Sequence, residues 1–401
     1  MRRVLAVGLA LTAAIACGPI GSTTDRNDGG PNGGGPDARP PLGCSEKHPA
    51  APDGYYTSGS TVCTSDGRTH LFHGVDRPSF EWSAKGDHVS ADDFGRMAND
   101  WRANVVRVAL NQDFWLEGAA LHDPLYRDRI DQAVHDAEAA GLDVILDLHW
   151  SDRGDLGVTK TGAQNTDGSS GQQQMADRNS IEFWKQVATK YKGDGRVLFE
   201  LYNEPNEISW DVWLHGGNVE GYAAVGMQAL YDAVRNVGAD NLVIAGGVLW
   251  AYDLSLAGSD RIQGYNVMYA THPYDKPDNQ PRGWDASWGY LASEDLAPVI
   301  VTEFGDGNDA CTGEWNKSVI DYADAHRISW TAWAWYPAGC NFPSIIEDWS
   351  GTPTMQGQVI KDALLAYPPE TRPSDAGVEA GTETGDADAG DGDAGDGETS
   401  D

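Results

Sequence analysis

Two apolar segments of this sequence each end in a carboxylate. Residues 197–202 are followed by Asn203 and Glu204, and residues 298–302 are followed by Glu303. Apolar runs of this length are typical of strands buried on both faces, and parallel α/β folds bind their ligands at the carboxyl ends of such strands. Hydrolysis of a glycosidic bond needs a proton donor and a second carboxylate, and two carboxyl groups at two strand ends could supply both.

The segment around Glu204 also has a purely structural interpretation. Pro205 favours an extended conformation at Glu204 and removes the next backbone donor, which is also what a strand ending in a solvated turn requires. The Asn-Glu-Pro turn alone does not separate the two interpretations. The second strand, ending on Glu303, favours the catalytic one.

The rest of the chain is expected to hold these two strands in one barrel. Strand-like and helix-like segments alternate between residues 44 and 367, as in a parallel sheet with crossover helices. The expected strands are residues 71–75, 104–110, 143–149, 197–202, 241–247, 264–270, 298–303 and 329–335. The expected helices are residues 91–101, 124–140, 179–191, 219–237, 314–325 and 355–366. Eight strands in series predict a single α/β domain with the (β/α)8 TIM-barrel fold.

Polar and aromatic residues collect at the carboxyl ends of the other predicted strands. They are Asp76, Arg107, His149, Trp150, His272, Tyr274, Trp333 and Trp335. Each has a plainer interpretation, because the histidines and tryptophans could be core residues. Arg107 could simply pair with Glu200, which has the same in-facing parity as Glu204. Their common position at one predicted rim favours a binding site.

The order of these residues resembles glycoside hydrolase family 5, the cellulase-like retaining glycosidases. The resemblance runs from about residue 71 to residue 335, and its motifs are Arg107, His149, Asn203-Glu204-Pro205, His272-x-Tyr274, Glu303 and an eighth-strand tryptophan. By this resemblance Glu204 is the acid/base and Glu303 is the nucleophile. Arg107 and Tyr274 would hold Glu303 in its ionised form.

The resemblance also implies a set of substrate-binding side chains. They are Arg107, His149, Trp150, Asn203, His272, Tyr274, Trp333 and Trp335. Asn203 would bind the sugar 2-hydroxyl, and His149 and His272 would line the central subsite. Trp333 would be the sugar platform, with Trp335, on the same strand face, as the alternative.

Electrostatics assigns the same two catalytic roles without the family. A carboxylate beside an arginine stays ionised and can attack, and Glu303 has Arg107 available. Glu204, less compensated and close to that negative charge, keeps its proton to higher pH. Carboxyl groups about 5 Å apart would give retention of anomeric configuration. Asp76 stands where many relatives carry Asn, which leaves its role open.

Aromatic content indicates the substrate class. The chain has 15 tryptophans, and the flat apolar face of a β-linked glucose or mannose unit stacks on indole. The tryptophans expected mostly in loops after strands are Trp82, Trp115, Trp150, Trp210, Trp213, Trp250, Trp284, Trp288, Trp333 and Trp335. The Gly-, Gln-, Asn- and Ser-rich residues 151–177 are expected to form a wall of the cleft.

The combined pattern predicts a retaining endo-β-glycanase acting on a β-1,4-linked polysaccharide, above all an endo-β-1,4-glucanase acting on cellulose or β-glucan. An endo-β-1,4-mannanase is the nearest alternative. A non-catalytic carbohydrate-binding barrel is a more distant one, which loss of either carboxylate or of Arg107 would favour, and none is lost.

Composition argues against other partners. The formal net charge is −33 and the isoelectric point is about 4.4, which disfavours nucleic acid and anionic membrane surfaces as partners. Histidines and aspartates are not spaced as metal ligands and no glycine-rich phosphate loop occurs, so we expect no metal and no cofactor. We expect the protein to act on its polysaccharide as a monomer.

Both ends of the chain are predicted to lie outside the barrel. Residues 1–17 have the charged start, apolar segment and small-residue cleavage site of an export signal, and cleavage would leave Cys17 first. This favours a surface lipoprotein attached to the membrane only through a lipid on Cys17, with ordinary secretion as the alternative. Residues 18–43 are interpreted as a flexible linker and residues 368–401 as a disordered acidic tail.

The remaining four cysteines are expected to form two disulfides. An exported chain can oxidise both pairs, Cys44 with Cys63 and Cys311 with Cys340. The second bond would tie together the loops that follow the seventh and eighth predicted strands.

Overall fold

The computed structural model describes residues 43–159, 172–276, 280–306 and 311–369. The predicted signal 1–17 lies outside the described residues, as do nearly all of the predicted linker 18–43 and acidic tail 368–401. The predicted catalytic domain, 44–367, falls within them apart from the internal gaps.

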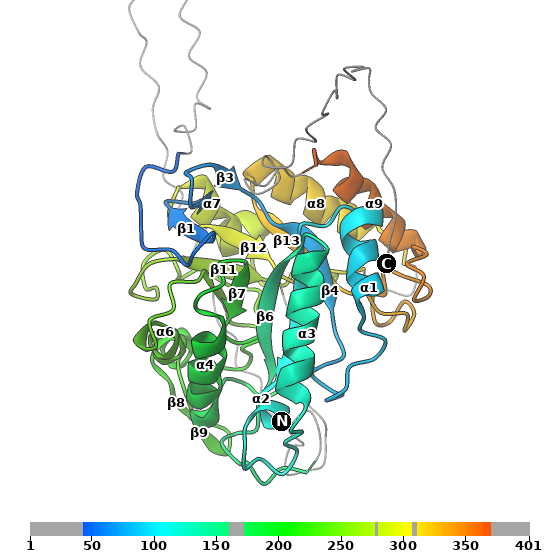
Figure 1. The fold of residues 1–401 in the computed structure, drawn as a ribbon. Coiled ribbons are helices and arrows are strands. Elements are labelled where there is room, and N and C mark those ends of the chain that lie inside the picture. The colour runs from blue at the N-terminus through cyan, green and yellow to red at the C-terminus, as the bar shows by residue number, and fades with distance from the viewer. Residues whose placement is uncertain (1–42, 160–171, 277–279, 307–310, 370–401) are drawn as a thin grey trace, which may run out of the picture. The chain divides into compact units, whose positions relative to one another are not determined.

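Eight parallel strands close into a barrel in the order β10-β11-β12-β13-β4-β5-β6-β7 (Figure 1). They are β4 (His73–Arg77), β5 (Val105–Asn111), β6 (Asp143–Trp150), β7 (Val197–Glu200), β10 (Val243–Gly246), β11 (Val267–Thr271), β12 (Val299–Val301) and β13 (Ser329–Ala332). Each overlaps one predicted strand, so the predicted (β/α)8 barrel is confirmed.

Helices connect most of these strands. They are α1 (Ala91–Gly95), α2 (Gln112–Trp115), α3 (Tyr126–Ala139), α4 (Arg178–Tyr191), α5 (Trp210–His215), α6 (Met227–Asn236), α7 (Tyr290–Ser293), α8 (Glu314–His326) and α9 (Met355–Ala366), with π-helical turns η1 (Arg96–Asp100) and η3 (Asp285–Gly289). Side chains fix several of the starts. Ser90 accepts from the Asp93 N–H at α1, and Asp177 begins α4 in a capping box with Ser180.

The helix predicted over residues 219–237 was wrong in its first part. Strands β8 (Gly217–Val219) and β9 (Tyr222–Ala224) form a short antiparallel hairpin there, and α6 begins only after Gly226. Gly221, with a φ of 86°, supplies the turn between the two strands, a conformation that favours glycine.

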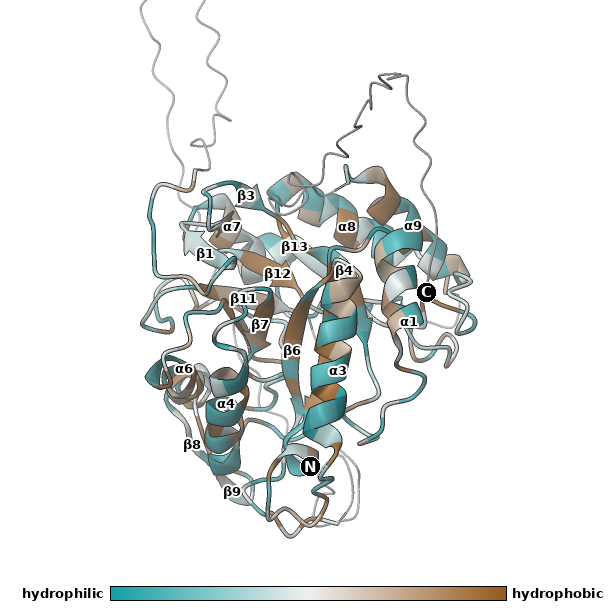
Figure 2. Ribbon diagram, viewed as in Figure 1, coloured by the Kyte–Doolittle hydropathy of each residue, from teal (hydrophilic) through white to brown (hydrophobic). Residues whose placement is uncertain are grey.

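The barrel interior changes from apolar to charged along the strands. One end is filled by Phe72, Val105, Ile145, Leu198, Ile244, Met268 and Ile300. Two residues further along three of these strands, on the same face, come Arg107, Asp147 and Glu200. Figure 2 shows that strands β6 and β7 are largely apolar, whereas helices α3 and α4 alternate hydrophilic and hydrophobic residues.

An N-terminal sheet that the sequence did not reveal packs against the apolar end. It consists of β1 (Tyr55–Ser58), β2 (Thr61–Thr64) and β3 (Thr69–His70). Tyr55 and Val62 join the apolar cluster in the barrel, and the Tyr55 hydroxyl donates to Asp143 Oδ2 at 2.6 Å. The charged end of the barrel is therefore the open one.

Both predicted disulfides are present. Cys44 bonds to Cys63 of β2, and Cys311 bonds to Cys340, which joins the segments that follow β12 and β13. The second bond therefore ties the two loops that the sequence indicated.

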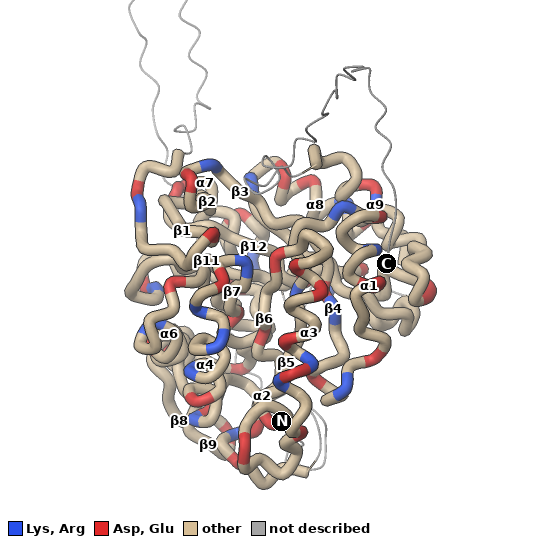
Figure 3. The backbone as a smooth tube through the Cα atoms, in the orientation of Figure 1, with Lys and Arg blue, Asp and Glu red and all other residues tan. Residues whose placement is uncertain are grey.

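Charged residues are interspersed over the described chain. In Figure 3, positively charged positions lie among negatively charged ones in most parts of the view. No helix in the described part of the chain has the length and apolar content needed to cross a bilayer.

Candidate active site

Arg107 lies on the in-facing side of β5 and is fully buried. Its guanidinium donates from Nε to Glu200 Oε2 at 2.6 Å, from Nη1 to Glu303 Oε1 at 2.7 Å and from Nη2 to Asn203 Oδ1 at 2.6 Å. The same Nη2 lies 3.0 Å from Asp147 Oδ2. Arg107 therefore pairs with Glu200 and holds Glu303 at once, and its planar fork fixes the directions of its partners.

Glu303 follows β12 and has a donor on each carboxyl oxygen. Arg107 contacts Oε1, and the Tyr274 hydroxyl donates to Oε2 at 2.9 Å. Burial raises the pKa of Tyr274 well above its usual value, so this phenol remains a donor. The ion pair and the hydrogen bond both stabilise an ionised carboxylate, which is the form that can attack.

Glu204 shares a hydrogen bond with His272. The His272 Nδ1 lies 3.0 Å from Glu204 Oε1, and its Nε2 lies 2.9 Å from Thr302 Oγ1. The Thr302 hydroxyl donates to Glu200 at 2.8 Å, so its oxygen accepts from the His272 Nε2–H. Burial lowers the pKa of His272 to about 4, hence the ring is neutral above that pH and its Nδ1 only accepts. The proton between Glu204 and His272 therefore belongs to Glu204.

Burial acts on Glu204 in the same direction. It raises the pKa of the Glu204 carboxyl to about 7, against smaller opposing effects of His149 and Arg107. Below that pH Glu204 is protonated, while Glu303 has a donor on each of its carboxyl oxygens. The two glutamates thus have the different environments that an acid and a nucleophile would need.

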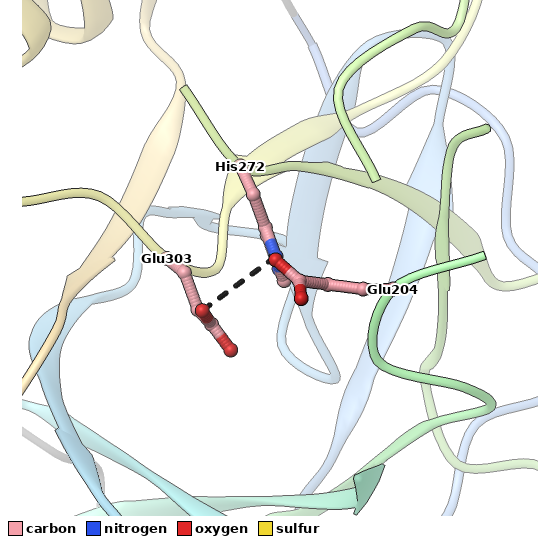
Figure 4. A group of neighbouring side chains, drawn as sticks. All are labelled: Glu204, His272 and Glu303. Carbon is pink, nitrogen blue, oxygen red and sulfur yellow. Dashed lines mark hydrogen bonds and ion pairs between the residues drawn. The ribbon is translucent and has the colours of Figure 1, made fainter. Parts of the chain in front are cut away.

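The two glutamates face each other beside His272 (Figure 4). One oxygen of each and one nitrogen of His272 lie within 4.8 Å of one another. This spacing fits the roughly 5 Å of retaining glycosidases and is shorter than the roughly 6.5–9.5 Å of inverting ones. The same three atoms could hold a metal ion, although both oxygens of Glu303 already have donors and a cation there would be repelled by Arg107.

His149 and Asn203 lie beside the pair. The His149 Nδ1 is 2.6 Å from Asp147 Oδ2, and its Nε2 is 3.4 Å from the Asn203 amide nitrogen. Burial lowers the pKa of His149 to about 4, so the neutral ring donates to Asp147 and leaves Nε2 as an acceptor. The Asn203 amide is thereby held with its oxygen toward Arg107 and its nitrogen toward His149.

Asp76, whose role the sequence left open, is the register neighbour of Arg107 on β4 and is buried. Burial raises the pKa of Asp76 well above its usual value. A neutral Asp76 limits the negative charge around Arg107, which already faces Glu200 and Glu303.

Gln172 was not identified from the sequence. When its side-chain amide is oriented so that both atoms have partners, the oxygen accepts from the Glu204 backbone N–H at 2.8 Å and the nitrogen lies 3.3 Å from Glu204 Oε2. Gln172 belongs to the segment 151–177, which was predicted to form a wall of the cleft, and residues 160–171 of that segment lie outside the described residues. A glutamine in a polar loop carries no sequence signal for such a contact.

Trp333 and Trp335 lie in different environments. The Trp333 ring is nearly parallel to His149, with centroids 5.6 Å apart, and it lines the cavity above the glutamates. Trp335 is 0% exposed, and its indole donates to Asp93 at 2.7 Å. The prediction of Trp335 as a substrate-binding residue was wrong, because β13 ends at Ala332 and the strand alternation that placed it beside Trp333 stops there.

The other tryptophans divide between cavity and core. Trp150 is half-buried next to His149 at the end of β6, and Trp250 is 39% exposed and lines the cavity. The tryptophans that were expected in loops and are buried are Trp115, Trp210, Trp213 and Trp288.

The two glutamates open into a cavity of about 510 Å³, whose lining also includes His272 and Tyr274. Its lining also contains residues that the sequence analysis did not single out as binding residues, namely Leu249, Tyr252, Lys276, Gln280 and Phe342. They follow β10, β11 and β13, and only closure of the barrel brings these loops together.

A closed parallel barrel with two carboxyl groups in this arrangement defines the (β/α)8 glycoside hydrolases. The sequence profile of the cellulase family, glycosyl hydrolase family 5, matches residues 63–339. The chain therefore belongs to glycosyl hydrolase family 5, and the resemblance seen in its motifs is confirmed.

The proteins that are similar in sequence to this chain include a cellulase and an endoglucanase. The chain is 28% identical over 260 residues to the cellulase CelDZ1 of a Thermoanaerobacterium species, which covers 61% of each protein. It is 25% identical over 301 residues to endoglucanase MaCel5A of a Microbulbifer species, covering 69% of this chain and 50% of that protein. The matched part of the chain thus spans about half to three-fifths of the length of these relatives.

A solved structure has the same fold. The native β-glucanase SdGluc5_26A of Saccharophagus degradans superposes with a TM-score of 0.61 at 24% identity, covering 80% of this chain and 98% of that one.

Replacing Trp335 by Phe should lower stability and leave catalysis intact. The change removes a donor to buried Asp93, which keeps its contact with Arg77 at 2.6 Å, and the free energy of unfolding should fall by about 1–3 kcal/mol. The Trp333→Phe variant should instead lower kcat/KM with little loss of stability. Denaturant unfolding and initial rates measure the two effects, and an equal loss of kcat/KM in both variants would contradict the separation of roles.

Proposed function

We propose that this protein is a retaining endo-β-glucanase that hydrolyses β-1,4-linked glucan by double displacement. One observation carries the proposal. Glu303 lies between the donors of Arg107 and Tyr274, while Glu204, whose pKa burial raises to about 7, faces Nδ1 of His272, and one oxygen of each glutamate lies within 4.8 Å of the other. An acid and a nucleophile are thus in place before substrate arrives.

In the first step, Glu303 attacks the anomeric carbon and Glu204 gives its proton to the departing glycosidic oxygen. The bond from the anomeric carbon to that oxygen breaks, the bond to Glu303 forms, and the leaving chain departs as an alcohol. Glu204 is then a carboxylate beside a neutral His272.

In the second step, Glu204 acts as a base. It takes a proton from a water molecule whose oxygen attacks the anomeric carbon, and the bond to Glu303 breaks. Both glutamates return to their starting states. Two displacements at one carbon give overall retention of configuration.

Glucan is the preferred substrate because the similar proteins include a cellulase and an endoglucanase. Trp250 and Trp333 in the cavity suit the flat face of a pyranose ring. Endo-β-1,4-mannanase activity is the alternative, and faster turnover of mannan than of β-glucan would favour it. A non-catalytic barrel is disfavoured because Glu204, Glu303 and Arg107 are all present.

We further propose that the protein is exported and works as a monomer outside the cell, either secreted or anchored by a lipid on Cys17. The signal-like residues 1–17 and two disulfides, which form in oxidising compartments, support export. In this layout the catalytic domain, 44–367, lies between the linker 18–43 and the tail 368–401.

The rate should depend on the proton of Glu204. Because the pKa of Glu204 is raised to about 7, the active protonated form is present below that pH and is lost above it. We expect kcat/KM on β-glucan to fall about tenfold per pH unit above pH 7. Dinitrophenyl cellobioside, whose leaving group needs no proton, is the control and should lack this alkaline limb in its glycosylation step. An alkaline limb shared by both substrates would contradict the assignment.

Two substitutions separate the roles of the glutamates. Glu204→Ala should nearly abolish β-glucan hydrolysis and still release a burst of phenol from dinitrophenyl cellobioside, followed by a low steady rate, because the base for the second step is missing. Glu303→Ala should abolish hydrolysis of both substrates without a burst, since no covalent intermediate forms.

Stopped-flow absorbance measures the burst, and circular dichroism checks that both variants fold. A burst in the Glu303 variant alone would reverse the two roles. Near-normal rates of both variants on β-glucan would refute the proposed reaction.

A further inference from the structure

Three buried aspartates meet beyond the carboxyl ends of β5 and β6. Asp113 is in α2, directly after β5, Asp152 follows β6, and Asp177 is the N-cap residue of α4. Asp113 and Asp152 are each 1% exposed, and Asp177 is 0% exposed. None of them lines the cavity that contains the two glutamates. Carboxylates removed from water are costly unless a positive charge compensates them.

Neutral amides hold Asp152 and Asp177 in place. Asp177 Oδ2 accepts from the Asp152 backbone N–H at 3.1 Å and from Gln112 Nε2 at 2.9 Å. The two carboxyl oxygens of Asp152 accept from Asn179 Nδ2 at 3.1 and 3.2 Å. In the described part of the chain, none of the three aspartates forms an ion pair with a lysine, arginine or histidine. Their negative charge is therefore not balanced by a side chain.

Asp113 has no hydrogen-bond donor on either carboxyl oxygen among the described residues. Its carboxyl faces that of Asp152 at hydrogen-bonding range. Burial and the neighbouring Asp152 raise the pKa of Asp113 to about 10, and the same two causes raise the pKa of Asp177 to about 7. A buried polar group without a partner marks a place for a bound ion or water.

A proton alone would satisfy this cluster only in part. Placed between Asp113 and Asp152, it gives one oxygen of Asp113 a partner and leaves the other oxygen buried without one. A divalent cation can take both oxygens of one carboxylate together with oxygens of its neighbours. The unpartnered carboxyl of Asp113 therefore favours a cation.

The three carboxyl groups still have to close on such an ion. Among the residues that the structure describes, the three side chains whose ligand atoms lie within 4.8 Å of one another are Glu204, His272 and Glu303. Asp113 can turn toward the other two aspartates without breaking a hydrogen bond, since its carboxyl has none. Ca²⁺ accepts irregular geometry and oxygen ligands, whereas Mg²⁺ demands a near-ideal octahedron and usually keeps several waters. A buried site built from separate segments therefore suits Ca²⁺.

We propose that Asp113, Asp152 and Asp177 bind one Ca²⁺ ion. The ion links the start of α2 to Asp152 and Asp177, which lie near the two ends of the segment 151–177, and this segment brings Gln172 to Glu204. No ligand spacing in the sequence indicates the site, because the three aspartates come from separate segments. The proposal does not depend on the glucanase function, since ion binding and stability are measured without substrate.

The test uses the full chain, stripped of metal with EGTA and titrated with CaCl₂ in a calorimeter. We expect one tightly bound Ca²⁺ per chain and a rise in Tm of about 3–6 °C at 1 mM Ca²⁺. MgCl₂ is the control and should raise Tm less. Binding at pH 8 should release about one proton per ion, because the pKa of Asp113 without the ion is about 10.

Two variants locate the ion. Asp113→Asn and Asp177→Asn keep the side-chain shape and remove one charge, and asparagine also serves as a helix N-cap. Both should bind Ca²⁺ at least about tenfold more weakly and lose the rise in Tm. Asp128→Asn, which changes an exposed aspartate of α3, is the matched control and should respond to Ca²⁺ like wild type. Circular dichroism checks that each variant folds.

Three results would overturn the proposal. If Ca²⁺ gave wild type neither saturable heat nor a higher Tm, protons alone would neutralise the cluster. If Ca²⁺ bound without releasing a proton at pH 8, its ligands would be carboxylates that are already ionised, as expected for the acidic residues 368–401. If the rise in Tm persisted in Asp113→Asn and Asp177→Asn, the ion would bind elsewhere.

Discussion

The site depends on one buried guanidinium. Arg107 contacts Glu200, Glu303, Asn203 and Asp147 at 2.6–3.0 Å, and all of these side chains are almost fully buried. Carboxylates removed from water are costly unless a cation compensates them, and loss of one partner of a buried ion pair costs about 3–5 kcal/mol. A lysine at this position could not replace Arg107, because it lacks the planar fork of N–H donors that contacts all four side chains at once.

The contact with Arg107 also distinguishes the two glutamates from each other. Glu303 takes a direct contact from Arg107, which stabilises a carboxylate, whereas Glu204 has no such contact and its pKa is raised by burial to about 7. His272 contributes to this difference through its two ring nitrogens. Its Nε2–H is committed to Thr302, which donates in turn to Glu200, so Nδ1 is left to accept the proton of Glu204. In the proposed reaction, Thr302 and Glu200 thereby help to set the proton state of Glu204, the acid.

Much of this site was predictable because strand alternation is local. Apolar runs located all eight strands, and the polar residues at their ends identified Arg107, His149, His272 and both glutamates. Trp335 was misassigned because alternation was extended past Ala332, where the strand ends. The contact of Gln172 with Glu204, and the lining of the cavity by Tyr252, Gln280 and Phe342, depend on loops that meet only after the barrel closes. No periodic pattern marks such residues.

The central claim is that Glu303, held by Arg107, forms a covalent bond to the sugar while Glu204 handles the proton. A 2-deoxy-2-fluoro cellobioside with a good leaving group slows the second step and accumulates the intermediate, which peptide mass spectrometry can locate. We predict one added fluorosugar per chain, on the peptide that contains Glu303 and attached to that residue. A label on Glu204, or hydrolysis with inversion and no trapped intermediate, would contradict the claim.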